Sequence, residues 1–411
     1  MNPSSSGAPR PLVVKAPIPS CRKGATAIPQ IAKAFRESGF TTPSYVLDQR
    51  AFHHNGSILK HVQDKTGAKI LLAQKAFSCT AIYPILRNYL AGTTASGLFE
   101  ARLGAQDFGG DVHVFSPAYK PAEMAELVQI ADHIVFNSLT QWQQYREQVL
   151  CADRKISAGL RINPEYAEAC AEIYNPCAPG SRFGILASLM NDDDLEGIEG
   201  LHFHTLCEQG ADALERTLAH VFAKFDKYLR KMKWLNMGGG HLITSDHYDV
   251  PRLIHLIKET QARYPQLQIF LEPGEAISSG AGVLIGSVID IVENSMQIAV
   301  LDVSATTHMP DILEMPYRPD VEGSGQPGEK KYSYRFGGPT CLSGDVIGDY
   351  SFDRELQIGD QIVFHDMAHY TMVKNTTFNG VPLPSISIMR DGGPVEMVRE
   401  FDYQDFKNRL G

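Results

Sequence analysis

The apolar residues of the chain alternate between two patterns. From Pro43 onward, short apolar or β-branched runs are followed by longer segments in which apolar residues recur three and four positions apart. The short runs indicate buried strands, and the spacing of three and four indicates amphipathic helices. The repeated order of strand and helix is typical of a parallel sheet. This part of the chain therefore predicts an α/β architecture.

The strands and helices can be placed individually. The expected strands are Lys69–Ala73, Thr93–Ala95, Asp111–Phe115, His133–Phe136, Ser157–Ile162, Gly200–His204, Trp234–Met237 and Gln268–Leu271. The expected helices between them include Ile82–Leu90, Pro121–Ile130, Gln141–Leu150, Ala211–Lys231 and Arg252–Arg263. Eight strands with intervening helices over about 200 residues match a (β/α)8 barrel, which is typically about 250 residues long. We therefore expect such a barrel within residues 43–275.

The pattern changes after Pro273 to apolar runs separated by Gly, Pro and Asp turns. These runs are Gly282–Val292, Met296–Val303, Gln361–Phe364 and Ser385–Met389. They predict an all-β domain over residues 276–411, of β-barrel or β-sandwich type. A strand near residues 44–48 is a further candidate member of this β domain. Residues 1–25 are rich in Ser, Pro, Gly and Ala without apolar periodicity, so we expect a flexible segment there.

Length and charge narrow the classes of function. The 411 residues suffice for two domains of ordinary size. With 38 Lys and Arg against 47 Asp and Glu, the net charge of −9 disfavours nucleic acid or an anionic membrane as the main partner. A small cationic ligand suits this charge better. No apolar run approaches the length of a membrane span, and Met1–Gln30 lacks the apolar block of a signal peptide.

The cysteines indicate a reducing compartment. The chain has 7 of them, without a Cys-x-x-Cys pair or a zinc-type spacing. An odd, scattered set is typical of reduced thiols. We therefore expect a cytoplasmic protein without a metal site.

Four groups of polar residues follow expected barrel strands. Active sites of these barrels lie where the strands end. Lys75 follows the first strand, His204 ends the sixth with His202 on the same face, Met237–Gly240 follows the seventh, and Glu272 ends the eighth. Taken singly, each has an ordinary explanation: a solvated lysine, a core histidine, a turn, a loop carboxylate.

Together these residues suit one cofactor. Pyridoxal 5'-phosphate requires a lysine that can bond to its aldehyde carbon, a flat side chain against its ring, a binding site for its phosphate, and a carboxylate for its ring nitrogen. Backbone N–H groups of a glycine-rich turn can hold a phosphate. The carboxylate keeps the ring nitrogen protonated, which makes the ring an acceptor for the electrons of a broken bond. The combination therefore predicts a pyridoxal-phosphate enzyme.

With these motifs the sequence resembles the alanine-racemase-like (fold type III) pyridoxal-phosphate decarboxylases, which include ornithine and diaminopimelate decarboxylases. The resemblance covers roughly Pro43 to Arg399. The strings HFHTLCE (202–208), NMGGGH (236–241), EPGEA (272–276), GPTCLSGD (338–345) and HDMAHYTMVKNTTFNG (365–380) are similar to the carboxynorspermidine/carboxyspermidine decarboxylase branch. The strings YNPCAPGSRFG (174–184) and LEMPYRP (313–319) are similar to the same branch.

The resemblance implies roles for individual residues. Lys75 is implied to bind the cofactor covalently and His204 to stack on its ring. The phosphate would be bound by Cys207, Gly238, Gly239, Gly240 and Tyr370, and the ring nitrogen by Glu272. Arg161 matches a family arginine near the cofactor. Cys341 matches a cysteine that is delivered from the second subunit and protonates the carbanion, so the resemblance implies a homodimer with shared active sites.

Two departures bear on the substrate. Ornithine and diaminopimelate decarboxylases carry Glu-Pro-Gly-Arg, whereas Glu275 takes the place of that arginine. Leu342 follows Cys341 where an acidic residue is often found. Both departures favour the carboxyspermidine branch, whose products are norspermidine and spermidine. The carboxylates expected to meet the amines of this cationic substrate are Glu275, Asp302, Asp311, Glu314 and Asp345.

Two alternatives stay open at this point. The chain could be a decarboxylase of diaminopimelate or another basic amino acid. It could also be a non-catalytic relative that keeps the fold to bind a partner or the cofactor.

Overall fold

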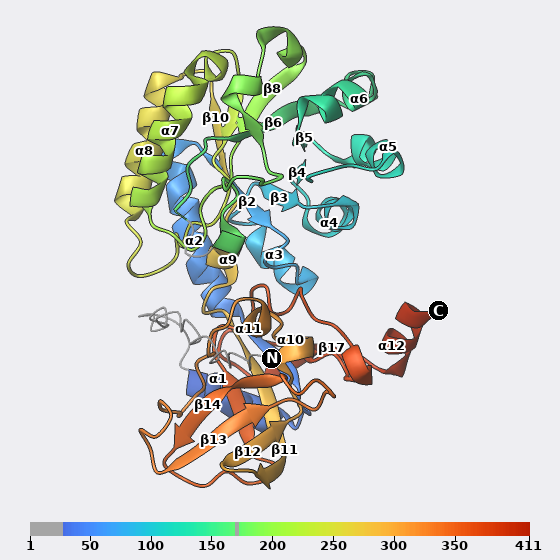
Figure 1. The fold of residues 1–411 in the computed structure, drawn as a ribbon, viewed down its shortest axis with the longest axis vertical. Coiled ribbons are helices and arrows are strands. Elements are labelled where there is room, and N and C mark those ends of the chain that lie inside the picture. The colour runs from blue at the N-terminus through green and yellow to red at the C-terminus, as the bar shows by residue number, and fades with distance from the viewer. Residues whose placement is uncertain (1–27, 169–171) are drawn as a thin grey trace, which may run out of the picture. The chain divides into compact units, whose positions relative to one another are not determined.

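A computed structural model of the chain describes residues 28–168 and 172–411, which form two compact units (Figure 1). We call Gln49–Ala281 the barrel unit, and the described residues up to Asp48 together with Gly282–Gly411 the sheet unit. The sequence placed the second boundary after residue 275, whereas the units divide after Ala281. The expected flexible segment 1–25 lies outside the described residues.

The barrel unit is a closed parallel barrel, as the sequence predicted. Its strands are β2 (Lys69–Ala73), β3 (Gly92–Ala95), β4 (Asp111–Phe115), β5 (His133–Phe136), β6 (Ser157–Asn163), β8 (Ile198–His202), β9 (Trp234–Asn236) and β10 (Gln268–Leu271). Each pairs in parallel with its neighbours, and the β5–β6 and β10–β2 pairings close the circle. The expected sixth strand ran to His204, but β8 ends two residues earlier, at His202.

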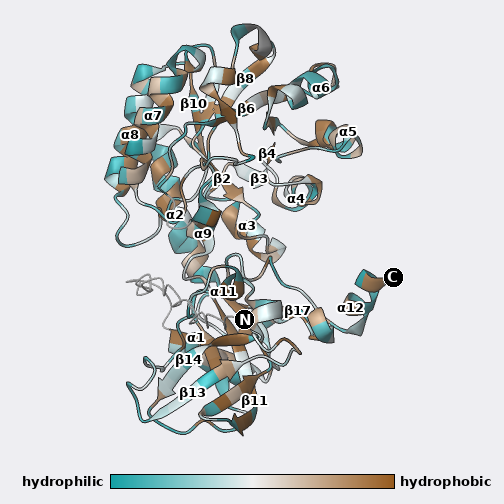
Figure 2. Cartoon of the chain, viewed as in Figure 1, coloured by the Kyte–Doolittle hydropathy of each residue, from teal (hydrophilic) through white to brown (hydrophobic). Residues whose placement is uncertain are grey.

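One helix precedes the first barrel strand, and others follow most of the barrel strands. They are α2 (Gln49–Thr66), α3 (Tyr83–Leu86), α4 (Leu98–Leu103) with a π-helical turn Gly104–Phe108, α5 (Pro121–Ile130), α6 (Leu139–Leu150), α7 (Ala211–Leu229), α8 (Val250–Arg263) and α9 (Glu275–Ser278). Figure 2 shows hydrophilic residues along the outer sides of α7 and α8. Between β6 and β8 the described chain forms short 3-10 turns and β7 (Ile185–Leu186).

One helix is shorter than its sequence pattern. The apolar spacing predicted a helix over Ile82–Leu90, whereas α3 ends at Leu86. The Asn88 side-chain amide donates to the carbonyls of Pro84 and Ile85, at 2.9 and 3.1 Å. Such local bonds compete with the continuation of a helix. The chain therefore turns toward β3 after one helical turn.

The sheet unit is built on one mixed sheet. Its strands are β1 (Ser44–Asp48), β11 (Gly282–Glu293), β12 (Gln297–Leu301), β13 (Tyr332–Gly337), β14 (Val346–Phe352), β15 (Gln361–Phe364), β16 (Ser385–Met389) and β17 (Val395–Arg399). Their order is β14-β13-β12-β11-β1-β16-β17, and β15 pairs with β11. β1 lies between β11 and β16, so the strand near residues 44–48 joins this sheet. The described helices of the unit are α1 (Ile28–Ser38), α10 (Ala305–His308), α11 (Asp311–Glu314) and α12 (Tyr403–Leu410).

Both faces of this sheet are covered around β1. Successive side chains of a strand point to opposite faces. Val46 packs with Ile31 and Phe35 of α1, whereas Tyr45 belongs to a second cluster that includes Phe336 and Phe364. Burial on both faces explains why β1 and the first half of β11 read as continuous apolar runs rather than as alternating ones.

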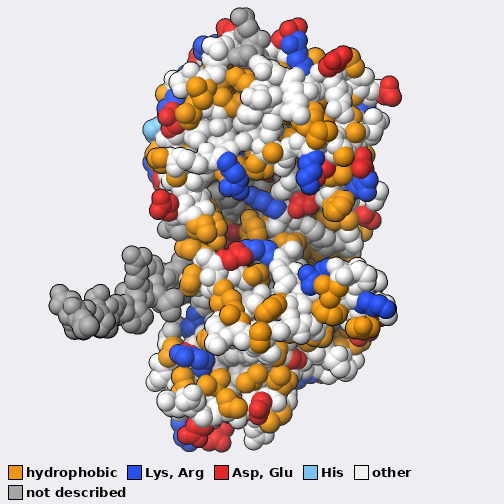
Figure 3. Space-filling view, turned by 45° about the vertical axis from the view of Figure 1, so that its right-hand side comes forward, with side chains coloured by type: hydrophobic (Ala, Val, Ile, Leu, Met, Phe, Trp, Pro, Cys, Tyr) orange, Lys and Arg blue, Asp and Glu red, His pale blue; other side chains and the backbone are white. Residues whose placement is uncertain are grey.

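Two observations concern the surface. None of the helices in the described ranges is long and apolar enough to cross a membrane. On the face visible in Figure 3, basic and acidic side chains are interspersed over both units. A mixed surface of this kind fits the modest net charge of the chain.

The indole ring of Trp234 in β9 packs against two glycines of neighbouring barrel strands. The Trp234 side chain lies over Gly159 of β6 and Gly200 of β8, where an added Cβ would come within 2.2 and 1.9 Å of the ring. Its Nε1 donates to Ser157 Oγ at 2.8 Å. The two glycines therefore make room for the tryptophan.

We expect Gly200→Ala to destabilise the protein, because the added methyl group overlaps the Trp234 ring. Overpacking of this kind costs about 1–3 kcal/mol of the free energy of unfolding, measured by denaturant titration. Gly97→Ala is the control, since a Cβ at Gly97 meets nothing within 4 Å and its φ of −174° is extended. Equal losses in the two variants would contradict the packing argument.

Candidate active site

The residues expected to bind a cofactor in the barrel unit lie at the ends of its strands. Lys75 follows β2, His204 follows β8, Gly238–Gly240 follow β9, and Glu272 directly follows β10. Because all barrel strands are parallel, their carboxyl ends form one rim. The structure thus brings these side chains to one place, as the sequence indicated.

Lys75 and His204 are in direct contact. Lys75 Nζ lies 3.1 Å from His204 Nε2, and His204 Nδ1 accepts a hydrogen bond from the Gly239 N–H at 3.2 Å. A neutral imidazole whose Nδ1 accepts carries its proton on Nε2. Nε2 therefore donates to Lys75, and an amine can accept this bond only when it is uncharged.

The electrostatic surroundings agree with an uncharged lysine. Although the Lys75 side chain is solvent-accessible, the loss of water around its amine lowers its pKa, and the positive charge of Arg161 lowers it further. Burial also holds the pKa of His204 well below its usual value, so its imidazole is neutral. A neutral lysine is the form that attacks an aldehyde carbon.

Glu272 is a largely buried carboxylate that is hydrogen-bonded to the side chains of Asn236 and Thr94. Its Oε1 accepts from Asn236 Nδ2 at 2.7 Å, and its Oε2 lies 3.5 Å from His202 Nε2. Burial raises the pKa of Glu272, and the Asn236 hydrogen bond opposes this. Burial also keeps the pKa of His202 well below its usual value, so that this imidazole is neutral. Because His202 is neutral, it does not form an ion pair with Glu272 Oε2.

Asn236 is a site residue for which the sequence predicted no role. Besides its bond to Glu272, its Oδ1 accepts from the Gly238 N–H at 2.9 Å. One side chain therefore fixes both the carboxylate and the first glycine of the turn. The signal available in the sequence was its place two residues before the first of the three glycines.

The three glycines are required by close backbone packing. A Cβ at Gly238 would lie 2.4 Å from the Phe203 carbonyl oxygen, one at Gly239 2.1 Å from that of Glu272, and one at Gly240 2.0 Å from that of Leu206. Gly238 and Gly240 also have φ values of +70° and +82°, which favour glycine. The turn after β9 therefore passes between the segments that follow β8 and β10.

Of these glycines, Gly240 is the one best placed to bind an anion. The N–H groups of Gly238 and Gly239 are bonded to Asn236 and His204. Gly240 is partly exposed, and within the described chain its N–H makes no hydrogen bond. Exposed backbone N–H groups in such turns bind phosphate.

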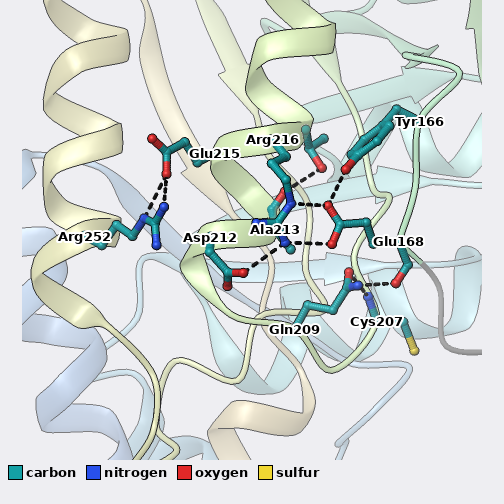
Figure 4. A network of polar contacts seen from close by, with 10 residues as sticks. Tyr166, Glu168, Cys207, Gln209, Asp212, Ala213, Glu215, Arg216 and Arg252 are labelled. Atoms are coloured by element: carbon teal, nitrogen blue, oxygen red, sulfur yellow. Dashed lines mark hydrogen bonds and ion pairs between the residues drawn. The ribbon is translucent and has the colours of Figure 1, made fainter.

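The segment that contains Cys207 is held by a network of polar contacts through Gln209 and Glu168 (Figure 4). Gln209 N–H donates to the Gly240 carbonyl at 3.0 Å, and Gln209 Oε1 accepts from Cys207 N–H at 3.4 Å. The Gln209 amide also donates to the carbonyl of Glu168, whose carboxylate accepts from Arg216 Nε and Nη2 at 2.5 and 2.7 Å. These bonds link the loop after β6 to the loop after β8.

Arg161 lies beneath His204. Its Nη2 donates to the His204 carbonyl at 3.1 Å, and its guanidinium carbon lies 4.6 and 4.3 Å from the ring centres of Phe115 and Phe183. Burial lowers its pKa to about 10, so the guanidinium is charged at neutral pH. Cation–π contacts partly replace the water that it loses. Arg161 thus supplies the charge that lowers the Lys75 pKa.

The other expected site residues belong mainly to the sheet unit. Cys341 is exposed, and Tyr370 is half-buried with a φ of +47°. Asp302 accepts from Thr42 Oγ1 at 2.5 Å and from Ser287 N–H at 2.7 Å. In the barrel unit, Glu275 is partly exposed at the first position of α9.

The remaining three acids have partners within the sheet unit. Asp311 and Glu314, at the two ends of α11, both pair with the Lys374 ammonium. Asp345 is almost fully buried, and its carboxylate accepts from Ser304 Oγ and Thr340 Oγ1. The sequence could not indicate these contacts, because every partner except Thr340 is distant along the chain from the carboxylate that it contacts.

The residues of the barrel rim fit pyridoxal phosphate. An uncharged lysine lies beside a histidine ring, a buried carboxylate keeps one oxygen without a charged partner, and an accessible glycine N–H lies near Cys207. These groups correspond to the aldehyde, the ring nitrogen and the phosphate.

The comparisons agree on one family. Residues 44–368 match the family model described as pyridoxal-dependent decarboxylase, C-terminal sheet domain. Over 377 residues the chain is 46% identical to the carboxyaminopropylagmatine decarboxylase of Synechocystis sp., with 92% of this chain and 97% of the relative covered. It is 45% identical over 379 residues to the carboxynorspermidine/carboxyspermidine decarboxylase of Campylobacter jejuni, with 90% and 98% covered.

Solved structures show the same similarity. The carboxynorspermidine decarboxylase of Campylobacter jejuni, crystallised with norspermidine, aligns with a TM-score of 0.83 at 42% identity and covers 90% of this chain and 100% of its own. The diaminopimelate decarboxylase of Helicobacter pylori aligns at 0.77 with 16% identity, covering 92% and 98%, which shows a shared fold.

Replacing Asn236 should weaken cofactor binding. Asn236→Leu removes the stronger of the two side-chain hydrogen bonds that lower the Glu272 pKa, so a larger fraction of Glu272 should be protonated and unable to hold the proton of the ring nitrogen. We expect the dissociation constant of pyridoxal phosphate, measured by fluorescence titration, to rise about ten- to a hundredfold, as for the loss of a hydrogen bond to a charged group. Thr260→Val, which removes a buried hydrogen bond on α8, should leave it unchanged. Unchanged cofactor affinity in Asn236→Leu would argue against this role for Glu272.

Proposed function

The chain belongs to the pyridoxal-dependent decarboxylase family, and from this membership we propose that it removes the carboxylate of carboxyspermidine or carboxynorspermidine. The products would be spermidine or norspermidine. The enzyme is a carboxy-lyase that uses pyridoxal phosphate. The observation that carries the proposal is the arrangement of Lys75, His204 and Glu272 at the barrel rim, in a chain 45% identical to the Campylobacter jejuni enzyme.

Pyridoxal phosphate, when bound, takes up the electron pair that is left when the bond from Cα to the carboxylate breaks. Lys75 offers it an uncharged amine, which Arg161 and the loss of water maintain. Glu272 would hold the proton of the ring nitrogen, and Asn236 keeps that carboxylate in position. His204, fixed by the Gly239 N–H, would lie against the ring.

We propose that carboxylates select the polyamine substrate. Asp311 and Glu314 already accept a primary ammonium, that of Lys374, which is the same chemical group as the end of a polyamine. Glu275 is the candidate within the barrel unit, three residues from Glu272. Asp302 is a further candidate, whereas the buried carboxylate of Asp345 is already bonded inside the protein.

Carboxyaminopropylagmatine is a second candidate substrate. The Synechocystis relative that carries this name is 46% identical over 92% of this chain, almost the same identity as for the Campylobacter jejuni enzyme. The substrate in its name ends in a guanidinium group rather than an ammonium group. Diaminopimelate decarboxylases are more distant, for example 29% identical for the enzyme of Haemophilus influenzae.

We further propose that the enzyme is a cytoplasmic homodimer in which Cys341 of one subunit protonates the substrate carbon at the site of the other. The support is the resemblance of the GPTCLSGD string to the corresponding segment of the family. The described cysteines are free thiols, as a reducing compartment requires.

Steady-state kinetics of carbon dioxide release tests the substrate. We expect the largest kcat/KM with carboxyspermidine or carboxynorspermidine, followed by carboxyaminopropylagmatine and then diaminopimelate. The Lys75→Ala variant should be inactive with each compound, and it serves as the control for uncatalysed release of carbon dioxide. A preference for diaminopimelate would overturn the proposal, and a preference for the guanidinium compound would establish the second candidate.

Mixing two inactive variants tests the shared site. Lys75→Ala and Cys341→Ala chains should regain about a quarter of the wild-type activity after subunit exchange, because half of the dimers of twofold symmetry then contain one intact site. Lys75→Ala mixed with the double variant carrying both changes is the matched control and should stay inactive. If the first mixture also stays inactive after verified exchange, Cys341 does not act across subunits.

A further inference from the structure

The loop that carries Cys341 connects β13 to β14 and is closed on itself. Gly338 N–H donates to the Asp345 carbonyl at 2.9 Å, and Asp345 N–H donates to the Leu342 carbonyl at 2.9 Å. These bonds shape the loop but leave the Cys341 side chain exposed. Two contacts with residues outside the loop hold the backbone around Cys341.

The first contact is made through Asp345, whose side chain points into the sheet unit. Only 4% of Asp345 is exposed. Its carboxylate accepts from Ser304 Oγ at 2.8 Å and from Thr306 N–H at 3.1 Å, both at the start of α10. It also accepts from Thr340 Oγ1 at 2.6 Å, so Asp345 links the residue before Cys341 to α10.

The identity of a neighbouring residue agrees with this inward orientation. A Cβ at Gly338 would lie 2.3 Å from Asp345 Oδ2, so the loop has no room for another side chain there. With its oxygens bonded to buried donors, this carboxylate is not directed at a substrate. Although Asp345 lies only three residues after Leu342, it therefore does not take over the role of the acidic residue that often follows the family cysteine.

The second contact comes from Asn379. Its Oδ1 accepts a hydrogen bond from the Cys341 N–H at 2.9 Å. Asn379 has a φ of +58°, a conformation that asparagine adopts more readily than most side chains. Gly380 follows with a φ of +72°, and its missing Cβ would lie 3.9 Å from the Phe406 ring of α12. The turn at Asn379 and Gly380, which accepts the bond from Cys341, thus lies against α12.

We infer that Asn379 and Asp345 are positioning residues for Cys341. They fix consecutive residues of the loop, Asp345 through Thr340 and Asn379 through the Cys341 N–H, so the backbone at the cysteine is held and its Cα–Cβ bond points in one direction. This inference rests on the proposed function, in which the S–H bond of Cys341 breaks, its proton bonds to the carbanionic Cα, and the thiolate regains a proton from solvent. A thiol carried on a Cα–Cβ bond of fixed direction approaches the substrate Cα from one face.

The experiment measures both rate and stereochemistry in D2O. Wild-type enzyme should give monodeuterated product of a single configuration at Cα. Asn379→Gly keeps the left-handed backbone but loses the acceptor; we expect kcat to fall about tenfold with little change in KM, and the deuterium to appear in both configurations. Asn379→Asp keeps an acceptor oxygen and should restore both properties.

Two further variants separate this role from a general structural effect. Ser295→Gly alters another residue with a left-handed φ, +59°, in the β11–β12 turn, and should behave as wild type. Asp345→Asn replaces one carboxylate oxygen by an NH2 group that faces the backbone N–H of Thr306 or of Thr340, neither of which can accept a hydrogen bond, and should reproduce the Asn379→Gly result. Visible absorption of the bound cofactor shows that each variant retains a formed site.

The outcomes distinguish a failure of the proposed role of Cys341 from a failure of the positioning role of Asn379 and Asp345. If Cys341→Ala has normal kcat and a single product configuration, the proposed role of Cys341 fails. If Cys341→Ala is impaired but Asn379→Gly and Asp345→Asn are both normal, the positioning role fails while the proposed function stands. If Asn379→Asp is as impaired as Asn379→Gly, the acceptor oxygen is not what positions the cysteine.

Discussion

The barrel rim depends on a close approach of three backbone segments. The turn after β9 runs between the segments that follow β8 and β10, and the carbonyl oxygens of Phe203, Glu272 and Leu206 occupy the places where side chains of Gly238–Gly240 would be. This packing brings His204 to the Gly239 N–H and Asn236 to Glu272. The uncharged state of the Lys75 amine then follows, because Nε2 of the fixed His204 ring can only donate a hydrogen bond to it.

The sequence predicted the barrel better than the sheet, for a physical reason. Barrel strands are buried on both faces and appear as apolar runs, so their positions were visible. β13, β14 and β17 were missed because charged residues interrupt their apolar pattern. In β13, for example, Arg335 pairs across the sheet with Asp349 of β14, at 2.8 Å, and such cross-strand partners cannot be read from either strand alone.

The same limit applies to the site. Lys75, His204 and Glu272 could be predicted because their side-chain chemistry, at the ends of strands, points directly to the cofactor. Asn236 and Gln209 act by bonding to groups brought near by folding, so the sequence does not distinguish them from ordinary polar residues. Asp345 shows the converse: its residue type suggested a substrate contact, whereas its side chain faces inward.

The membership of β1 in the sheet constrains how this protein forms during synthesis. β1 pairs with β11, with Leu47 opposite Gly282, and the whole barrel unit lies between these two strands in the sequence. A ribosome therefore releases β1 long before its partners β11 and β16 exist, whereas every strand of the barrel precedes β11. Domains fold as units during synthesis, and pairings distant in sequence form slowly. The barrel can therefore close while β1 is still an unpaired strand that the cell must keep from aggregating.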